Sequence, residues 1–108
     1  MALTRDFQET VKEMLDSSSG FRRELLREAL NTMLEGDVDT GKAVLRSYIN
    51  GTIGFPGLAE AMGRSPKSLM RMLSPDGNPQ AKNLFEIVAI LQKKEGVRLE
   101  LRTVKAAA

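Results

Sequence analysis

Apolar residues recur along most of the chain at the three- and four-residue spacing that is typical of amphipathic helices. This spacing predicts helices over residues 4–16, 21–34, 39–50 and 79–95, with two shorter helices between residues 54 and 72. The stretch 79–95 is apolar on nearly every side, which predicts a central and well-covered helix. Gly36 and Gly96 follow two of these stretches and are typical helix stops. The chain is therefore expected to be all-α, with five to six helices.

The residues after Gly96 follow a different pattern. Val97, Leu99 and Leu101 alternate with charged residues, and this two-residue period predicts one short C-terminal β-strand. A lone strand in a helical chain needs a partner for its backbone N–H and C=O groups. The same strand of a second copy across a two-fold axis would supply it, which predicts a homodimer joined by an antiparallel ribbon. A frayed terminus or an edge that faces solvent is the alternative.

The stretch from residue 54 to residue 72 has the spacing of a helix-turn-helix. Ala59 and Gly63 are four residues apart and small, as needed where two helices approach and the chain turns. Ser65 followed by Pro66 is typical of a helix start, because serine can cap the helix and proline has no N–H to leave unpaired. An ordinary pair of packed helices in a helical core is the alternative interpretation.

A turn separates this motif from the last predicted helix. Within residues 74–79, Pro75 and Gly77 occupy positions that suit a type I turn. Asn78 followed by Pro79 repeats the pairing of a capping side chain with a proline, so the last helix is predicted to begin there.

Length and composition restrict the function further. With 108 residues, the chain is expected to form a single compact domain. Within it, residues 1–51 are expected to be helices that pack on or extend the core, and residues 52–104 to hold the helix-turn-helix and the strand. There is no cysteine and no histidine, which removes disulfides, thiolate metal sites and the commonest general base. We therefore expect no metal, no cofactor and no enzymatic activity.

Location follows from the absence of two sequence signals. No apolar run approaches the length of a membrane span, and the first residues lack the apolar core of a signal peptide. A soluble, cytoplasmic protein is expected.

Charge is unevenly distributed, although the net charge is only +2. Residues 1–51 hold seven Lys and Arg against nine Asp and Glu, whereas residues 52–108 hold nine against five. The positive charge thus lies in the part that holds the proposed helix-turn-helix, as binding to phosphate requires. The alternative is that these residues only solvate exposed faces, which fits Lys93, Lys94 and Lys105.

The second helix of the motif offers a candidate face for reading DNA. A recognition helix contacts bases through outward residues of its first two turns. The expected base contacts are Pro66, Lys67, Met70 and Arg71. Lys67 and Arg71 are four residues apart on one face and can donate to guanine, Arg71 through two parallel bonds. The expected phosphate contacts are Arg64, Ser65, Ser68, Ser74, Asn78 and Lys82.

One feature departs from this pattern. The first helix of the motif begins with Phe55 and Pro56, which offer no polar cap and no anchor for phosphate.

The run GFPGLAEAMGRSPKSLMRMLSPDGNP, residues 54–79, resembles the helix-turn-helix domains of the Cro/repressor class, and more narrowly the HigA-like antitoxins among the addiction-module antidote proteins. With the following helix and strand, the resemblance covers about the last half of the chain. The matching positions are Ala59, Gly63, Ser68, Leu69, Leu73, Ser74, Gly77, Asn78 and Pro79. The resemblance implies a lambda-repressor-like fold and a dimeric antitoxin that represses its own operon. It also implies a RelE-like ribonuclease toxin as partner.

The expected function is sequence-specific binding to double-stranded operator DNA by a transcriptional regulator of antitoxin type. Two alternatives remain open at this point. One is a stand-alone or phage-like repressor without a toxin, and the other is a helical protein-interaction adaptor that does not bind DNA.

Overall fold

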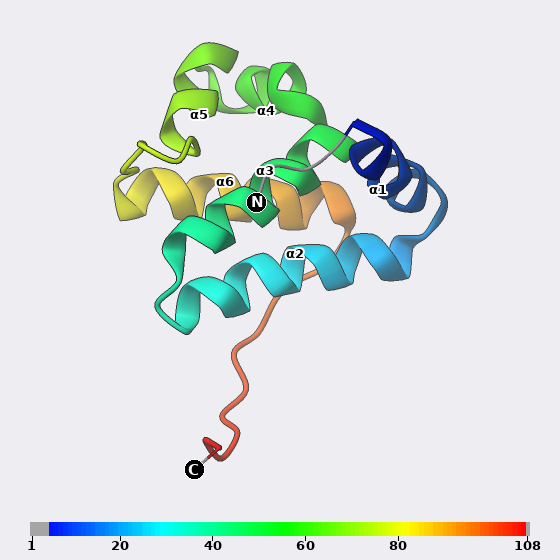
Figure 1. The fold of residues 1–108 in the computed structure, drawn as a ribbon. Helices are drawn as coiled ribbons and strands as arrows, with labels where there is room; N and C mark the ends of the chain where they lie inside the picture. Colours follow the sequence, from blue (N-terminus) through cyan, green and yellow to red (C-terminus); the bar gives the residue numbers. More distant parts are fainter. Residues whose placement is uncertain (1–4, 108) are drawn as a thin grey trace.

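The structure is a computed structural model that describes residues 5–107, with only the backbone of Arg5. Over this range the chain forms six α-helices and no strand (Figure 1). The helices are α1 (Arg5–Ser17), α2 (Ser19–Leu34), α3 (Val38–Gly51), α4 (Gly54–Met62), α5 (Pro66–Met72) and α6 (Ala81–Glu95). The all-α prediction of five to six helices is confirmed, while the predicted first helical residue, Thr4, lies outside the described range. None of the described helices is long and apolar enough to cross a membrane.

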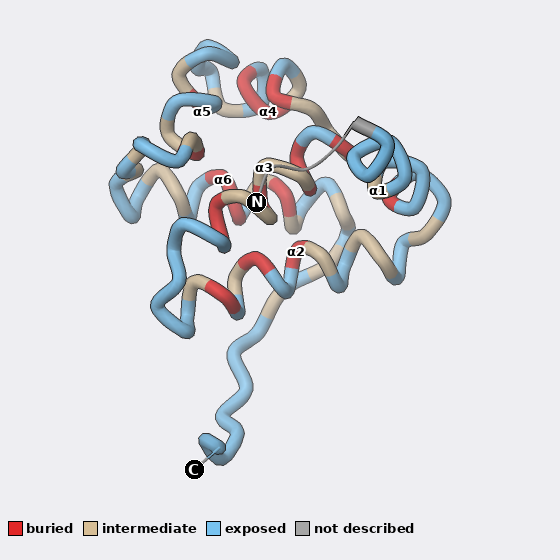
Figure 2. The backbone as a smooth tube through the Cα atoms, viewed as in Figure 1, coloured by how far each residue is buried: buried red, intermediate tan, exposed pale blue. Residues whose placement is uncertain are grey.

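The core is built around α3, which contacts α1, α2 and α4. Every helix contributes at least one fully buried apolar side chain to it. The buried residues, red in Figure 2, lie mainly where the helices face one another. These side chains include Leu15, Leu26, Leu45, Ile49, Leu58, Leu69, Ile87 and Leu91. One shared core therefore supports both the N-terminal helices and the helix-turn-helix.

Local signals set several helix ends. The Asp37 carboxylate begins α3 by accepting from the Thr40 N–H at 3.2 Å. Hydrogen bonding from the Thr40 side chain, together with this backbone bond, holds the pKa of Asp37 below its usual value. Gly36 and Gly96 follow α2 and α6 with φ of 98° and 72°, a conformation that glycine adopts without steric cost. The predicted glycine stops are thus confirmed.

The start and the burial of α6 differ from the prediction. The helix begins at Ala81 rather than at Asn78 and Pro79, and Gln80 precedes it without a capping side-chain bond. Asn78 precedes Pro79, and the extended backbone favoured before a proline fits a loop as well as a helix cap. Here the loop continues to Gln80. The expectation of a well-covered helix is also wrong, because only one side of α6 meets the core. Phe85 on the other side is 62% exposed.

The predicted C-terminal strand is wrong as well. Residues 97–107 leave α6 as an extended tail, which runs away from the body at the end opposite α4 and α5 (Figure 1). The Val97 N–H donates to the Gln92 carbonyl at 3.0 Å and the Leu99 N–H to Gln92 Oε1 at 2.7 Å, so the first residues stay attached. Leu101 is 82% exposed. Alternation indicates extended backbone, but a strand needs a ladder partner, and the rest of the described chain supplies none.

Candidate nucleic-acid interface

Helices α4 and α5 form the two-helix motif predicted for residues 54–72. Gly63 joins them with φ of 67°, so the chain reverses at a residue that tolerates the left-handed conformation. Ser65 Oγ accepts from the Ser68 N–H at 3.1 Å, and Pro66 is the first residue of α5. The cap predicted at Ser65 is confirmed, and the motif packs on the core through buried Leu58.

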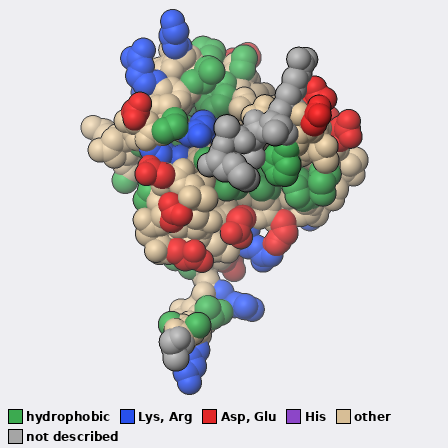
Figure 3. All heavy atoms as spheres, viewed as in Figure 1, with side chains coloured by type: hydrophobic (Ala, Val, Ile, Leu, Met, Phe, Trp, Pro, Cys, Tyr) green, Lys and Arg blue, Asp and Glu red, His purple; other side chains and the backbone are tan. Residues whose placement is uncertain are grey.

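The outward side of α5 holds all four residues predicted to contact bases. Pro66, Lys67 and Arg71 are exposed, Met70 is 52% exposed, and Leu69 between them is buried. Among the described residues, neither Lys67 nor Arg71 is in an ion pair. On the face seen in Figure 3, Lys and Arg side chains project at this end of the molecule and along the tail. Acidic side chains are spread more widely over the body, and a few also lie at this end. Helix α5 therefore turns an apolar side towards the core and exposes two cations on its outward side.

The residues predicted to contact phosphate divide into two groups. Three of them already serve the fold: Ser65 caps α5, Ser74 Oγ donates to the Arg71 carbonyl at 2.8 Å, and Arg64 Nη2 donates to Asn83 Oδ1 at 2.9 Å. The bond from Arg64 fixes the turn between α4 and α5 against α6.

The other predicted phosphate contacts lie in α5 and in the segment that follows it. Asn78 and Lys82 are exposed, while Ser68, within α5, is half-buried. Of the six predicted residues, Arg64, Asn78 and Lys82 thus keep donors that face solvent.

Two cations of α3 support this motif, and they were not among the predicted site residues. Lys42 is 2% exposed, and its Nζ donates to the carbonyls of Ser74 at 3.1 Å and Gly77 at 2.6 Å. Arg46 Nη1 donates to the carbonyl of Leu73, at the end of α5. Positive charge at a helix C-terminus is favourable because the last carbonyls have no partner within the helix. The sequence did hold a signal for Lys42. It lies three residues before Leu45, so helical periodicity places it on the same inward face of α3 as that buried leucine.

The apolar start of α4 also has a structural explanation. Phe55 is 4% exposed and belongs to the core, and Ile53 precedes the helix without a capping bond. The first turn of α4 is therefore used for packing rather than for holding phosphate.

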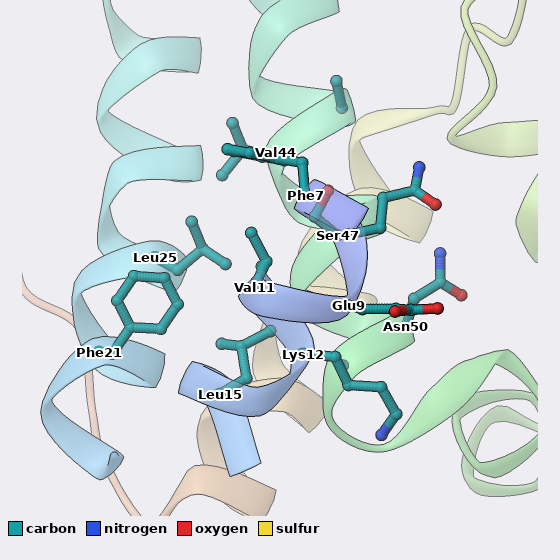
Figure 4. Close-up of a pocket in the computed structure, with 13 residues that line it drawn as sticks. Phe7, Glu9, Val11, Lys12, Leu15, Phe21, Leu25, Val44, Ser47 and Asn50 are labelled. Carbon is teal, nitrogen blue, oxygen red and sulfur yellow. The ribbon is translucent and has the colours of Figure 1, made fainter. Parts of the chain in front are cut away.

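A hollow of about 700 Å³ opens between α1, α2 and α3 (Figure 4). Val11, Leu25 and Val44 form an apolar side, while Lys12 and Asn50 lie on the other. The described part of the chain contains no group of three or more acidic, His or Cys side chains placed to hold a metal. The hollow thus offers an apolar surface between the three helices.

Comparison of the chain with protein-family models, with curated proteins and with solved structures finds no match.

Replacing Lys42 with methionine is expected to lower the free energy of unfolding by roughly 1–3 kcal/mol, because the half-buried carbonyls of Ser74 and Gly77 lose their donor. Urea denaturation measures the change. The matched control is Lys12→Met, whose exposed side chain forms a 3.5 Å ion pair with Asp16 and should change stability by less than about 0.5 kcal/mol. Equal effects of the two substitutions would contradict the assigned role of Lys42.

Proposed function

We propose that this chain is a sequence-specific transcriptional regulator that inserts α5 into the major groove of double-stranded operator DNA. The proposal rests on the outward face of α5. Lys67 and Arg71 lie on this face, and neither is in an ion pair among the described residues. The helix that presents them follows a glycine turn and has a capped start. The excess of basic residues in the half of the chain that holds this motif supports the same reading.

Recognition would depend on two kinds of contact. Arg71 donates two parallel hydrogen bonds to O6 and N7 of guanine, and Lys67, one turn earlier, donates to a neighbouring acceptor. Met70 offers apolar contact to a thymine methyl group. Arg64 and Asn78 precede and follow α5 in the chain and bind phosphates, which positions the helix without selecting a sequence.

The biological setting rests on the resemblance of residues 54–79 to HigA-like antitoxins. On that basis we propose a cytoplasmic homodimer that represses its own operon and binds a RelE-like toxin. Co-purification of a small ribonuclease encoded beside the gene would support this setting. Operator binding without any such partner would favour the stand-alone repressor instead.

Replacing Arg71 with alanine is expected to weaken binding to the chain's own upstream DNA by roughly 1–3 kcal/mol, or about 5- to 150-fold, and to relax sequence preference. Arg64→Ala should weaken operator and random DNA alike and reduce the salt dependence of binding, because it removes an exposed cation predicted to contact phosphate. Mobility-shift titrations at several salt concentrations measure both effects.

The control for these titrations is Arg23→Ala, which removes an exposed arginine of α2 and should leave binding unchanged. If Arg71→Ala bound operator and random DNA as the unaltered chain does, α5 would not be the recognition helix. If the unaltered chain bound no DNA, the protein-interaction adaptor would remain.

A further inference from the structure

One side of α6 leaves a large aromatic side chain in water. Phe85 is 62% exposed, and Ala81 and Ala89, one turn before and after it, are exposed too. On the other side of the same helix, Ile87 and Leu91 are buried. An aromatic residue at the centre of an exposed apolar face is typical of a protein–protein contact.

Two opposite charges lie beside Phe85, and a two-fold rotation would bring each of them close to its opposite on a second copy. Lys82 and Glu86 are exposed on this face, and neither is in an ion pair within the described part of the chain. When two α6 helices lie antiparallel with Phe85 near the axis, Lys82 of one copy lies within about 3 Å, measured along the helix, of Glu86 of the other. The symmetry forms this pair twice.

The position of the face suits a DNA-binding dimer. Asn83, which accepts from Arg64 of the helix-turn-helix, directly follows Lys82, and consecutive residues lie about 100° apart around a helix. Phe85 lies two residues after Asn83, so the two side chains are about 160° apart and the motif lies on nearly the opposite side of α6 from Phe85. Contact between two α6 faces centred on Phe85 therefore leaves both helix-turn-helix motifs uncovered.

A dimer joined by paired C-terminal tails, rather than by α6, would arrange the recognition helices differently. The tail leaves the molecule at the end opposite α5 (Figure 1). The two-fold axis of an antiparallel ribbon is perpendicular to its strands, so two tails paired in this direction turn the α5 helices away from each other.

We propose that the exposed face of α6 is a homodimer interface, occupied by the same face of a second copy, with Phe85 at its centre and reciprocal pairs of Lys82 with Glu86. The purpose of this dimer rests on the proposed function, since a dimer carries two recognition helices, but the association itself does not depend on DNA.

Sedimentation of the full-length chain without DNA, over a range of concentrations, tests the interface. The unaltered chain should be dimeric, and Phe85→Glu should raise the dimer dissociation constant at least about tenfold, because it places like charges at the axis. Leu101→Glu is the matched control, since it adds the same charge at an exposed apolar residue of the tail and should leave the dimer intact. Circular dichroism should show unchanged helix content in both variants.

A charge exchange tests the register. Lys82→Glu and Glu86→Lys should each weaken the dimer, and the double variant should recover most of the loss because both pairs are restored with opposite sign. A monomeric unaltered chain, or loss of the dimer in Leu101→Glu but not in Phe85→Glu, would overturn the interface. Failure of the double variant to recover would overturn the antiparallel arrangement.

DNA binding is measured separately, so the two proposals can fail independently. If Phe85→Glu is monomeric and binds a single half-site but loses tight binding to the full operator, both proposals are supported. If the dimer responds as expected but the unaltered chain binds no DNA, the interface stands and the proposed function fails.

Discussion

Replacing Glu95 with alanine is expected to lower the free energy of unfolding by roughly 3 kcal/mol, the low end of the range for breaking a buried ion pair. The Glu95 side chain is only 5% exposed, and its two carboxylate oxygens accept from Arg22 Nε at 3.1 and 3.0 Å. Its Oε1 also accepts from the Tyr48 hydroxyl at 2.6 Å. The low end applies because Arg22 is 28% exposed and would keep some contact with water.

This cluster joins four helices through one carboxylate. Arg22 of α2 also donates through Nη1 to the Leu15 carbonyl of α1 at 2.8 Å, while Tyr48 belongs to α3 and Glu95 to α6. Burial, together with the neighbouring Glu95 carboxylate, raises the pKa of Tyr48 well above its usual value. The phenol therefore keeps its proton at neutral and mildly alkaline pH and can donate to Glu95 throughout that range.

Urea denaturation at neutral pH measures the effect of Glu95→Ala. The control is Glu24→Ala, which removes a glutamate that pairs with Arg27 on the exposed surface of α2 and should change stability by less than about 0.5 kcal/mol. If both variants lost the same small amount, the cluster around Glu95 would not hold the four helices together.

Replacing Gly77 with alanine is expected to cost about 3 kcal/mol of stability, the upper end of the range for overpacking. A Cβ at this position would lie 2.2 Å from the Arg71 carbonyl oxygen and 2.4 Å from that of Met72. Both are backbone atoms at the end of α5, so no flexible side chain can yield. The turn from residue 74 to residue 77, closed by the Gly77 N–H to the Ser74 carbonyl at 2.9 Å, would have to move away.

Thermal and urea denaturation test this expectation, with Gly20→Ala as the matched control. Gly20 lies in α2, and the nearest atom to a Cβ there would be Ser18 Oγ at 3.7 Å, so alanine should be neutral or stabilise by up to about 1 kcal/mol. A Gly77→Ala variant as stable as the unaltered chain would show that the turn is not held against α5.

Features coded by neighbouring residues were predictable from the sequence. The serine cap and the proline at the start of α5, the glycine after α6 and the turn at residues 74–77 each depend on a few consecutive residues. The outward face of α5 was predictable too, because helical periodicity fixes which side chains share a face.

Features that depend on distant partners were not predictable in the same way. Alternation after Gly96 indicated extended backbone correctly, but only the three-dimensional arrangement shows that no segment of the described chain pairs with it. The bond from Arg22 to Glu95 joins residues 73 apart, and nothing in either helix alone identifies the partner. The apolar composition of α6 likewise hid the exposure of Phe85, since periodicity cannot show how many neighbours a helix has.

The support that α3 gives to α5 has a consequence for how this protein can be divided. Helix α5 has seven residues, fewer than the roughly 12–15 that an isolated helix needs to be even marginally stable in water. Its last carbonyl and the following turn are held by Arg46 and Lys42 from the other half of the sequence. The half of the chain that holds the proposed recognition helix is therefore not a transplantable module. A fragment that begins after α3 would keep every residue of the proposed DNA-contacting face and lose the scaffold that gives the face its shape.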